Sequence, residues 1–261
     1  MKEVSSYIVD WLNSYSQKSN TKGFVIGIPG GVDSALTSVL CALTGRKVIL
    51  VNMPILQTSA EYQRALKHIE NLKSRFENVS SFEIDLTDVF QSFSDKMPFE
   101  TTDALLAMAN SRARIRMTTL YAIAQVHGCL VAGTGNKIED FGIGFYTKYG
   151  DGGVDLSPIA DLTKTQVFKI AKAVDVIEDI LIAKPTDGLW PDGRSDEDQI
   201  GATYPELEWA MEFKGEEGML TEREKEVLKI YRSYHQANKH KMEPIPVCEL
   251  PQVLKENLLT L

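Results

Sequence analysis

The sequence predicts an α/β fold: a doubly wound, mainly parallel sheet with helices on both faces. Short apolar, β-branched runs alternate with longer segments in which apolar residues recur about every 3.6 positions, the pattern of strands alternating with helices. At 261 residues the chain is long enough to bury a substantial core. No repeat, low-complexity tract or linker interrupts this pattern. We therefore expect a single domain over residues 1–261, with a helical C-terminal part.

The expected elements follow in chain order, each strand as a short apolar run and each helix as a longer periodic one. The helix after the first strand carries apolar Leu36, Val39, Leu40 and Leu43 and stops near Gly45. A later helix begins at the capping box Thr221-Glu222-Arg223-Glu224 and ends near the basic run 239–241. The expected strands are 24–28, 48–53, 82–86 and 130–132, and the two other helices span about 59–76 and 103–127.

One segment, from Lys184 to Gly201, differs from the rest of the chain. It contains two prolines and two glycines within nine positions, followed by the acidic cluster Asp196-Glu197-Asp198. Few regular structures tolerate that spacing, so the segment predicts a long loop. Long loops in compact domains are often lids over a site.

A glycine-rich turn joins the first strand to the next helix. The run Gly27-Ile28-Pro29-Gly30-Gly31-Val32-Asp33-Ser34 has the layout of a phosphate-binding turn, in which a helix N-terminus faces an anion. It is no Walker A loop, because Val32-Asp33 stands where Lys and Ser/Thr are needed. An ordinary βα turn is the alternative. In parallel sheets ligands bind at the carboxyl ends of strands, which places the loops that begin at Gly27 and Gly133 at one edge.

Composition excludes several classes of protein. A formal net charge of -8 argues against a general nucleic-acid binder. No apolar stretch is long enough to span a bilayer and no signal peptide opens the chain, so we expect a cytoplasmic protein without a membrane partner. Cys41, Cys129 and Cys248 are far apart and odd in number, which predicts reduced structural thiols.

Several ordered motifs carry a family resemblance. The glycine turn is similar to the S-G-G-x-D-S loop of pyrophosphatase-loop enzymes, which cleave ATP between the α- and β-phosphates, with Pro29 in place of Ser. From about residue 5 to 250 the chain resembles NAD synthetase, and the run 147–153 is especially characteristic. The motifs are Ala113-Arg114-Ile115-Arg116-Met117, Gly133-Thr134-Gly135-Asn136-Lys137-Ile138-Glu139, Thr147-Lys148-Tyr149-Gly150-Asp151-Gly152-Gly153-Val154-Asp155 and Pro158-Ile159-Ala160-Asp161-Leu162-Thr163-Lys164.

The resemblance implies an adenine nucleotide alpha hydrolase-like fold and a ligase. Its reaction is the ATP-dependent amidation of deamido-NAD (nicotinic acid adenine dinucleotide) by ammonia, through an adenylate, to give NAD, AMP and pyrophosphate. It also implies Mg²⁺ and a homodimer, with deamido-NAD, ATP and ammonia as partners. Two alternatives stay open: a pyrophosphatase-loop enzyme that adenylates a different acid or a tRNA base, and an inactive nucleotide-binding module.

Roles carry over to matching residues. Asp33 and Glu139 match the metal positions, Lys164 is placed to stabilise charge on the reacting phosphate, and Asp151 is a candidate to hold ammonium and remove its proton. Taken alone, Asp33 reads as a helix-start acid, Lys164 as a solvated lysine and Asp151 as a turn former. The implied ATP contacts are Gly27, Ile28, Pro29, Gly30, Gly31, Val32, Asp33, Ser34, Thr134, Lys164 and Thr186; the implied deamido-NAD contacts are Arg114, Lys148, Asp155, His240 and Lys241.

The chain also departs from the family pattern. Pro29 lacks a hydroxyl and a backbone N–H that Ser offers, and one extra residue separates Glu139 from Lys148 relative to some bacterial members. Glutamine-using members carry an N-terminal amidase domain, whereas here the phosphate loop starts at Gly27; we expect direct use of ammonia, with a separate glutaminase partner left open. Segments 54–60 and 187–199 resemble the family's mobile loops and are expected to order over substrates.

Overall fold

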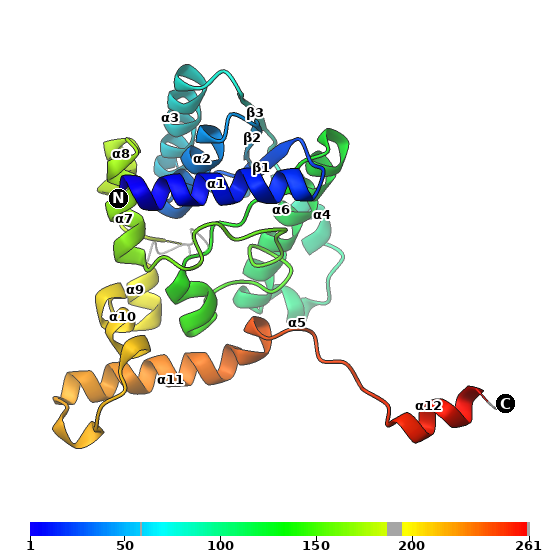
Figure 1. Ribbon diagram of the computed structural model, residues 1–261, viewed down its shortest axis with the longest axis vertical. Coiled ribbons are helices and arrows are strands. Elements are labelled where there is room, and N and C mark those ends of the chain that lie inside the picture. The colour runs from blue at the N-terminus through cyan, green and yellow to red at the C-terminus, as the bar shows by residue number, and fades with distance from the viewer. Residues whose placement is uncertain (58, 187–194, 260–261) are drawn as a thin grey trace.

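A four-stranded parallel sheet lies at the centre of the computed structural model, which describes residues 1–57, 59–186 and 195–259 (Figure 1). The strand order is β3-β2-β1-β4, and all three neighbouring pairs run parallel. The predicted fold class is confirmed. The strands are β1 (Gly23–Gly27), β2 (Lys47–Asn52), β3 (Val79–Glu83) and β4 (Leu130–Val131).

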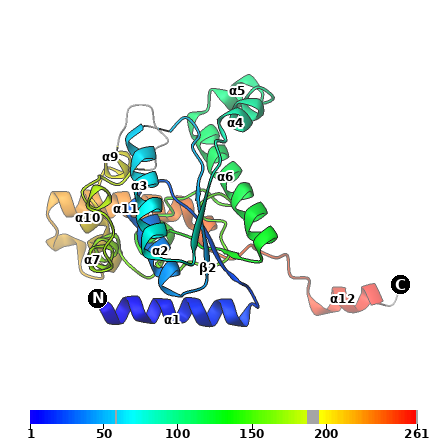
Figure 2. The same cartoon turned by 90° about the horizontal axis from the view of Figure 1, so that it is seen from above.

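Helices cover both faces of the sheet, as Figure 2 shows. Successive side chains of a strand point to opposite faces. Phe24 therefore packs into a core with α2 (Val32–Leu43) and α3 (Ser59–Arg75), while its neighbour Val25 packs toward α6 (Leu105–His127). Both residues are fully buried. The strands read as continuous apolar runs because both of their faces are covered.

The remaining helices complete these layers and add a wall at one side. Helix α1 (Lys2–Lys18) packs against α2, and α7 (Lys164–Ala173) packs against α2 and against α10 (Tyr204–Glu212). A third apolar cluster joins a π-helix to α10 and α11, with Ile143, Leu207 and Val227 at its centre. The helices are α1 (Lys2–Lys18), α4 (Thr87–Ser94), α5 (Phe99–Thr102), the π-helix η1 (Ile138–Ile143), α7 (Lys164–Ala173), α8 (Glu178–Leu181), α9 (Asp196–Ile200), α10 (Tyr204–Glu212), the 3₁₀ turn η2 (Glu217–Met219), α11 (Glu222–Met242) and α12 (Gln252–Leu259).

Two expectations about elements were wrong. The third strand is residues 79–83 rather than 82–86: it lies at the sheet edge, so one side needs no partner strand and its polar residues Ser80 and Ser81 are tolerated. The segment 184–201 is not a loop throughout, because Ser195 caps the short helix α9 with its hydroxyl. The rest of the predicted lid, residues 187–194, lies outside the described residues.

A buried polar pair joins α2 to α3. The His68 Nε2 atom lies 2.9 Å from the Ser38 hydroxyl, and both side chains are buried. Burial, with a smaller effect of Arg75, lowers the pKa of His68 to about 4. The ring is therefore neutral near pH 7, and it packs between the two helices without a counter-ion.

All three cysteines are free. Cys41 and Cys129 are buried, as expected of structural thiols, and burial raises the pKa of both. Cys248 is exposed, so the expectation of a structural thiol was wrong there. It lies beyond the last packed helix, where its side chain has no core to enter.

The C-terminal arm, residues 243–259, leaves the body of the molecule. After α11 the chain runs outward and ends in α12, which stands apart from the other helices in both views (Figures 1 and 2). Its apolar side chains are exposed, Val253 by 66%, Leu254 by 50% and Leu258 by 63%. An apolar helix face without a covering surface is the usual mark of an interaction site.

The sheet topology fixes where a ligand can enter. From β1 the chain goes outward to β2 and β3, and then returns to the other side of β1 as β4. The loops after β1 and β4 therefore diverge from each other, and such a switch point opens a crevice at the carboxyl ends of the strands. The predicted placement of the loops at Gly27 and Gly133 on one edge is confirmed, since both line one cleft of about 610 Å³.

Candidate active site

The glycine turn closes tightly against α3. Gly30 has φ +99°, and a Cβ there would lie 2.7 Å from the Glu61 carbonyl oxygen, so only glycine fits. Gly31 is the N-cap of α2 and supplies no capping side chain. The N–H groups of the first turn of α2 therefore face the cleft, which is the arrangement that binds an anion.

Two other groups of the turn are held by neighbouring atoms. The Ser34 hydroxyl donates to the Gly31 carbonyl oxygen at 2.9 Å, and the Gln57 side-chain amide donates to the Pro29 carbonyl oxygen at 3.0 Å. Pro29 itself is exposed. The proline thus fits the turn without a clash, and Gly30, Gly31 and Ser34 supply the N–H and hydroxyl groups.

Lys164 lies between the two carboxylates with which the family motifs associate it. Its Nζ atom donates to Asp33 Oδ2 at 2.7 Å and to Glu139 Oε1 at 2.9 Å. The residue is only 3% exposed, so the reading as a solvated lysine was wrong. The start of α2, the π-helix and the start of α7 thereby meet at one point.

The charges of Lys164, Asp33 and Glu139 set one another's ionisation states. Burial favours neutral Lys164, but the charges of Asp33 and Glu139 outweigh that effect and raise the pKa of the lysine. Burial raises the pKa of Asp33, and Lys164 only partly opposes it. Burial acts on Glu139 in the same direction, yet the Lys164 charge and the Tyr204 hydroxyl lower its pKa. The lysine is therefore held as a cation.

Two residues that sequence reasoning missed complete the cluster. The Tyr204 hydroxyl, from α10, donates to Glu139 Oε1 at 2.5 Å, and its ring centroid lies 4.7 Å from Lys164 Nζ. The Asn136 amide donates to Asp33 Oδ1 at 3.2 Å, and its oxygen accepts the backbone N–H of Glu139. Tyr204 lies 65 positions from Glu139, and no local pattern could have found it. Asn136 stands within a quoted motif and could have been found there.

The cleft brings most of the predicted site residues together. Arg116, a half-buried cation whose Nε donates to the Met53 carbonyl oxygen at 3.0 Å, also lines it although no role was expected of it. Burial and the nearby Arg112 lower the pKa of Arg116 to about 10. The predicted residues in the cleft wall are Gly27, Ile28, Pro29, Gly30, Gly31, Val32, Asp33, Ser34, Thr134, Glu139, Asp151, Lys164, Thr186 and Lys241.

Three of the predicted acceptor-binding residues lie outside the cleft and form a chain. Arg114 Nε donates to the Lys148 carbonyl oxygen at 3.2 Å, and Lys148 Nζ donates to the His240 carbonyl oxygen at 2.8 Å. Lys241, next along α11, turns inward and donates to the carbonyl oxygens of Gly144 and Tyr146. A positive strip therefore runs from the cleft wall to the surface; it is formed by Lys241, His240, Lys148 and Arg114.

Asp155 is separate from that strip. One carboxylate oxygen accepts the Tyr121 hydroxyl at 3.1 Å, and the other accepts the Val131 backbone N–H at 2.8 Å. These contacts tie the loop after residue 153 to α6 and β4. The structure therefore does not bring Asp155 together with the other predicted acceptor contacts.

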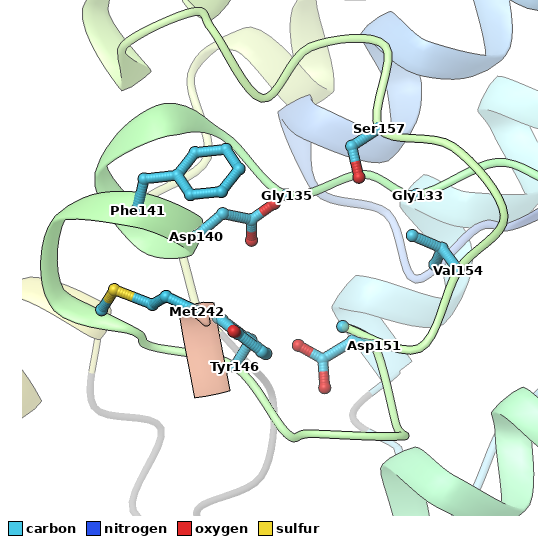
Figure 3. Close-up of a pocket in the computed structure, with 10 residues that line it drawn as sticks. Gly133, Gly135, Asp140, Phe141, Tyr146, Asp151, Val154, Ser157 and Met242 are labelled. Carbon is cyan, nitrogen blue, oxygen red and sulfur yellow. The ribbon is translucent and has the colours of Figure 1, made fainter. Parts of the chain in front are cut away.

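Asp151 faces Asp140 across a small cavity of about 130 Å³ beside the cleft (Figure 3). Asp151 Oδ1 accepts the Thr147 backbone N–H at 3.0 Å. Asp151 is an exposed residue of the cavity wall, and the loss of water around its carboxyl raises its pKa. Burial and the charges of Glu139 and Asp151 raise the pKa of Asp140 to about 8.

The first predicted mobile segment, 54–60, is anchored at one point. Ile55 is 1% exposed and belongs to the core beneath α6, whereas Leu56 is exposed with φ +51°. Its ordering over substrates stays a prediction. The helices of the described residues include none with the length and apolar character needed to cross a membrane.

Comparisons with known sequences and structures agree with this site. A sequence model described as NAD synthase matches residues 4–245. An NH(3)-dependent NAD(+) synthetase of Archaeoglobus fulgidus is 35% identical over 259 residues, which cover 97% of this chain and 99% of that protein. The enzyme of the same description from Mesoplasma florum is 36% identical over 210 residues, covering 80% of this chain and 83% of that one.

Solved structures have the same fold. An NMN synthetase from Francisella tularensis superposes with a TM-score of 0.82 at 32% identity, covering 96% of this chain and 98% of that one. An NH3-dependent NAD synthetase from Campylobacter jejuni, in complex with nitrate, gives a TM-score of 0.77, covering 95% of this chain and 99% of that one. Its identity is 23%, so that likeness speaks for the fold alone.

Proposed function

The chain belongs to the NAD synthase family, and from this premise we propose that it amidates deamido-NAD with ammonia at the expense of ATP, giving NAD, AMP and pyrophosphate. One observation supports this most directly. A buried lysine cation, Lys164, and two carboxylates, Asp33 and Glu139, converge beside a helix N-terminus that is open to an anion. That arrangement suits the transfer of a nucleotide phosphate.

In the first step the nicotinate carboxylate attacks the α-phosphate of ATP. A bond forms between the carboxylate oxygen and phosphorus, and the bond to the β-phosphate bridging oxygen breaks, with its electron pair leaving on pyrophosphate. The N–H groups at the start of α2 and the Ser34 hydroxyl suit the leaving pyrophosphate. Lys164 stabilises charge that develops on the α-phosphate.

Asp33 and Glu139 fit a magnesium site. Both carboxylates bond to the same Lys164 Nζ and therefore aim at one small space. The described residues hold no cluster of three or more His, Cys, Asp or Glu side chains that suits a metal. Two carboxylates match an ion that completes its oxygen shell with phosphate and water. Bound there, Mg²⁺ neutralises phosphate charge.

In the second step ammonia replaces AMP on the acyl carbon. Ammonium gives one proton to the Asp151 carboxylate, and the freed lone pair forms the C–N bond. The C–O bond to AMP breaks with its electron pair on the phosphate, and a second proton leaves the nitrogen for solvent. The position of Asp151, in both the small cavity and the cleft, supports this role.

The identity of the substrate that is amidated leaves a second candidate function. A structural neighbour at 32% identity is an NMN synthetase, and the same amidation of nicotinic acid mononucleotide yields NMN. The strip formed by Arg114, Lys148, His240 and Lys241 supports the dinucleotide, because it offers positive charge beyond the cleft. Arg114→Ala is expected to raise KM for deamido-NAD and to leave KM for the mononucleotide unchanged.

The homodimer implied by the resemblance is also part of the proposal. The exposed apolar residues of the C-terminal arm support it, since a second copy offers a surface that covers them. Asp155 stays a proposed acceptor contact in that dimer. A cytoplasmic location, a single domain and direct use of ammonia remain predictions.

The deciding experiment mixes the pure protein with ATP, magnesium and ammonium, and with either acceptor. The amide product, AMP and pyrophosphate are measured together. Equal amounts of all three with deamido-NAD support the proposed reaction. A larger kcat/KM with the mononucleotide favours the second candidate, and absence of amide with both acceptors contradicts amidation.

A further inference from the structure

The small cavity beside the cleft is walled by the π-helix η1, by Tyr146 and by the turn at 150–154. Figure 3 shows the carboxyl groups of Asp140 and Asp151 pointing toward each other across it, with the Tyr146 ring at one side. Gly133, Gly135, Asp140, Tyr146, Asp151 and Val154 line this cavity and the main cleft alike. The cavity therefore opens directly onto the space where nucleotides are expected.

Gly135 and Gly152 leave room for two polar side chains of the cavity wall, Asp140 and Tyr146. A Cβ on Gly135 would lie 2.1 Å from Asp140 Oδ1, so any other residue there displaces the carboxyl. A Cβ on Gly152 would lie 2.2 Å from the Tyr146 ring. Both contacts are far shorter than real carbon contacts. The position of Asp140 thus depends on the absence of a side chain at residue 135.

The Asp140 carboxylate has no protein partner in the described part of the chain: it accepts no hydrogen bond and forms no ion pair. Asp151, by contrast, accepts the Thr147 backbone N–H. The nearby cation, Lys241, gives its Nζ protons to the carbonyl oxygens of Gly144 and Tyr146. A largely buried carboxylate without a partner is costly, and a small cation in the cavity offsets that cost.

We propose that Asp140 holds the ammonium substrate across this cavity from Asp151. The inference rests on the proposed amidation and adds to it a residue with no expected role. Ammonium fits because it is small and has four N–H donors, enough for two carboxylates that face each other. Asp140 acts through its acceptor oxygens, and the bound cation favours their ionised form because an opposite charge lowers the pKa of a carboxyl, while Asp151 takes the proton before the nitrogen attacks the adenylate.

The test separates ammonium binding from folding and from adenylation. Asp140→Asn keeps the shape of the side chain and removes its charge. We expect KM for ammonium to rise about tenfold, the loss of one charge-assisted hydrogen bond. Exchange of labelled pyrophosphate into ATP, measured with acceptor and without ammonium, reports adenylation and correct folding, and it stays within about twofold of the parent, a change well under 1 kcal/mol.

A second nucleophile sharpens the result. Hydroxylamine is uncharged at neutral pH, so its use does not depend on a cation site and Asp140→Asn should use it as well as the parent does. Asp161→Asn is the matched control, because Asp161 is a surface carboxylate 96% exposed and paired with Lys137. The control should leave KM for both nucleophiles unchanged.

Two outcomes overturn the proposal. An equal loss with ammonium and hydroxylamine, or a loss of pyrophosphate exchange, assigns Asp140 a structural role. An unchanged KM for ammonium removes Asp140 from ammonium binding. Failure of the proposed function gives a different result, since the parent protein would then form no amide with either nucleophile.

Discussion

The Lys164 Nζ atom lies 2.7 Å from Asp33 Oδ2, so the cation proposed to act on phosphate contacts a carboxylate proposed to hold metal. Lys164 is buried and Asp33 is half-buried, and each compensates for the charge of the other. A metal ion at Asp33 and a phosphate at Lys164 would each replace one half of this ion pair. Nucleotide and magnesium are therefore expected to bind together more readily than either does alone.

Lys164→Met should abolish adenylation while the fold persists. Removal of a preorganised charge at the reacting phosphate lowers the rate of acceptor-dependent pyrophosphate exchange by at least about a hundredfold. Lys169→Met is the matched control, because Lys169 is exposed on the same helix. The assignment fails if both variants exchange pyrophosphate at the parent rate.

The same variant gives a second readout. With the lysine gone, Asp33 and Glu139 face each other without a cation, and Mg²⁺ added without nucleotide should bind more tightly than it does to the parent. Calorimetric titration measures the difference. Equal affinity in the two proteins would place the metal elsewhere.

Asp151→Asn should impair amidation more than adenylation. The substitution removes the proposed proton acceptor, an effect of about a hundredfold or more, but leaves the phosphate-binding groups in place. NAD formation and pyrophosphate exchange are measured on the same preparation. NAD formation at the parent rate would count against the role.

His68 should make stability fall in mild acid. Its pKa is lowered to about 4, so between pH 6.5 and 4 the unfolded chain binds a proton that the native protein does not, and stability drops as pH falls. From pH 7 to 5 the loss is about 2 kcal/mol. Urea unfolding at both pH values tests this, with His68→Gln expected to lose that part of the pH dependence. Identical pH dependence in the two proteins would refute the assignment.

The C-terminal arm should control oligomeric state. Val253→Asp together with Leu254→Asp places charge on exposed apolar positions of α12, where it cannot harm the body of the protein. Light scattering is expected to show a dimer for the parent and a monomer for the variant. Lys255→Asp, on the same helix, is the control for charge alone. A parent that is monomeric at all concentrations contradicts the dimer.

Local patterns predicted the elements and the strand-end loops because buried parallel strands are continuous apolar runs. Val79–Glu83 lacks that pattern because it lies at the sheet edge, so its limits were misplaced. Asp33, Glu139 and Lys164 come together as the motifs implied. The burial of Lys164, however, follows from packing against Tyr204, which belongs to a distant helix.

Asp140 could not have been singled out from sequence. Its character depends on a cavity, on Gly135 and on the facing Asp151, none of which is adjacent in the chain. Asp155 shows a different limit: its motif position predicts a contact with deamido-NAD, which stays a prediction, and the sequence did not indicate that its carboxylate bonds to Tyr121 and to the Val131 backbone. Sequence motifs identify residue types at a site, and tertiary packing decides which way each side chain points.

The π-helix Ile138–Ile143 carries two neighbouring carboxylates, Glu139 and Asp140, at the edge of the site. A π turn contains one more residue than an α turn, and such turns recur at functional sites. Consecutive residues then serve different spaces: Glu139 the phosphate cleft, and Asp140 also the small cavity. One helical turn thereby supplies an acidic group to each of the two spaces.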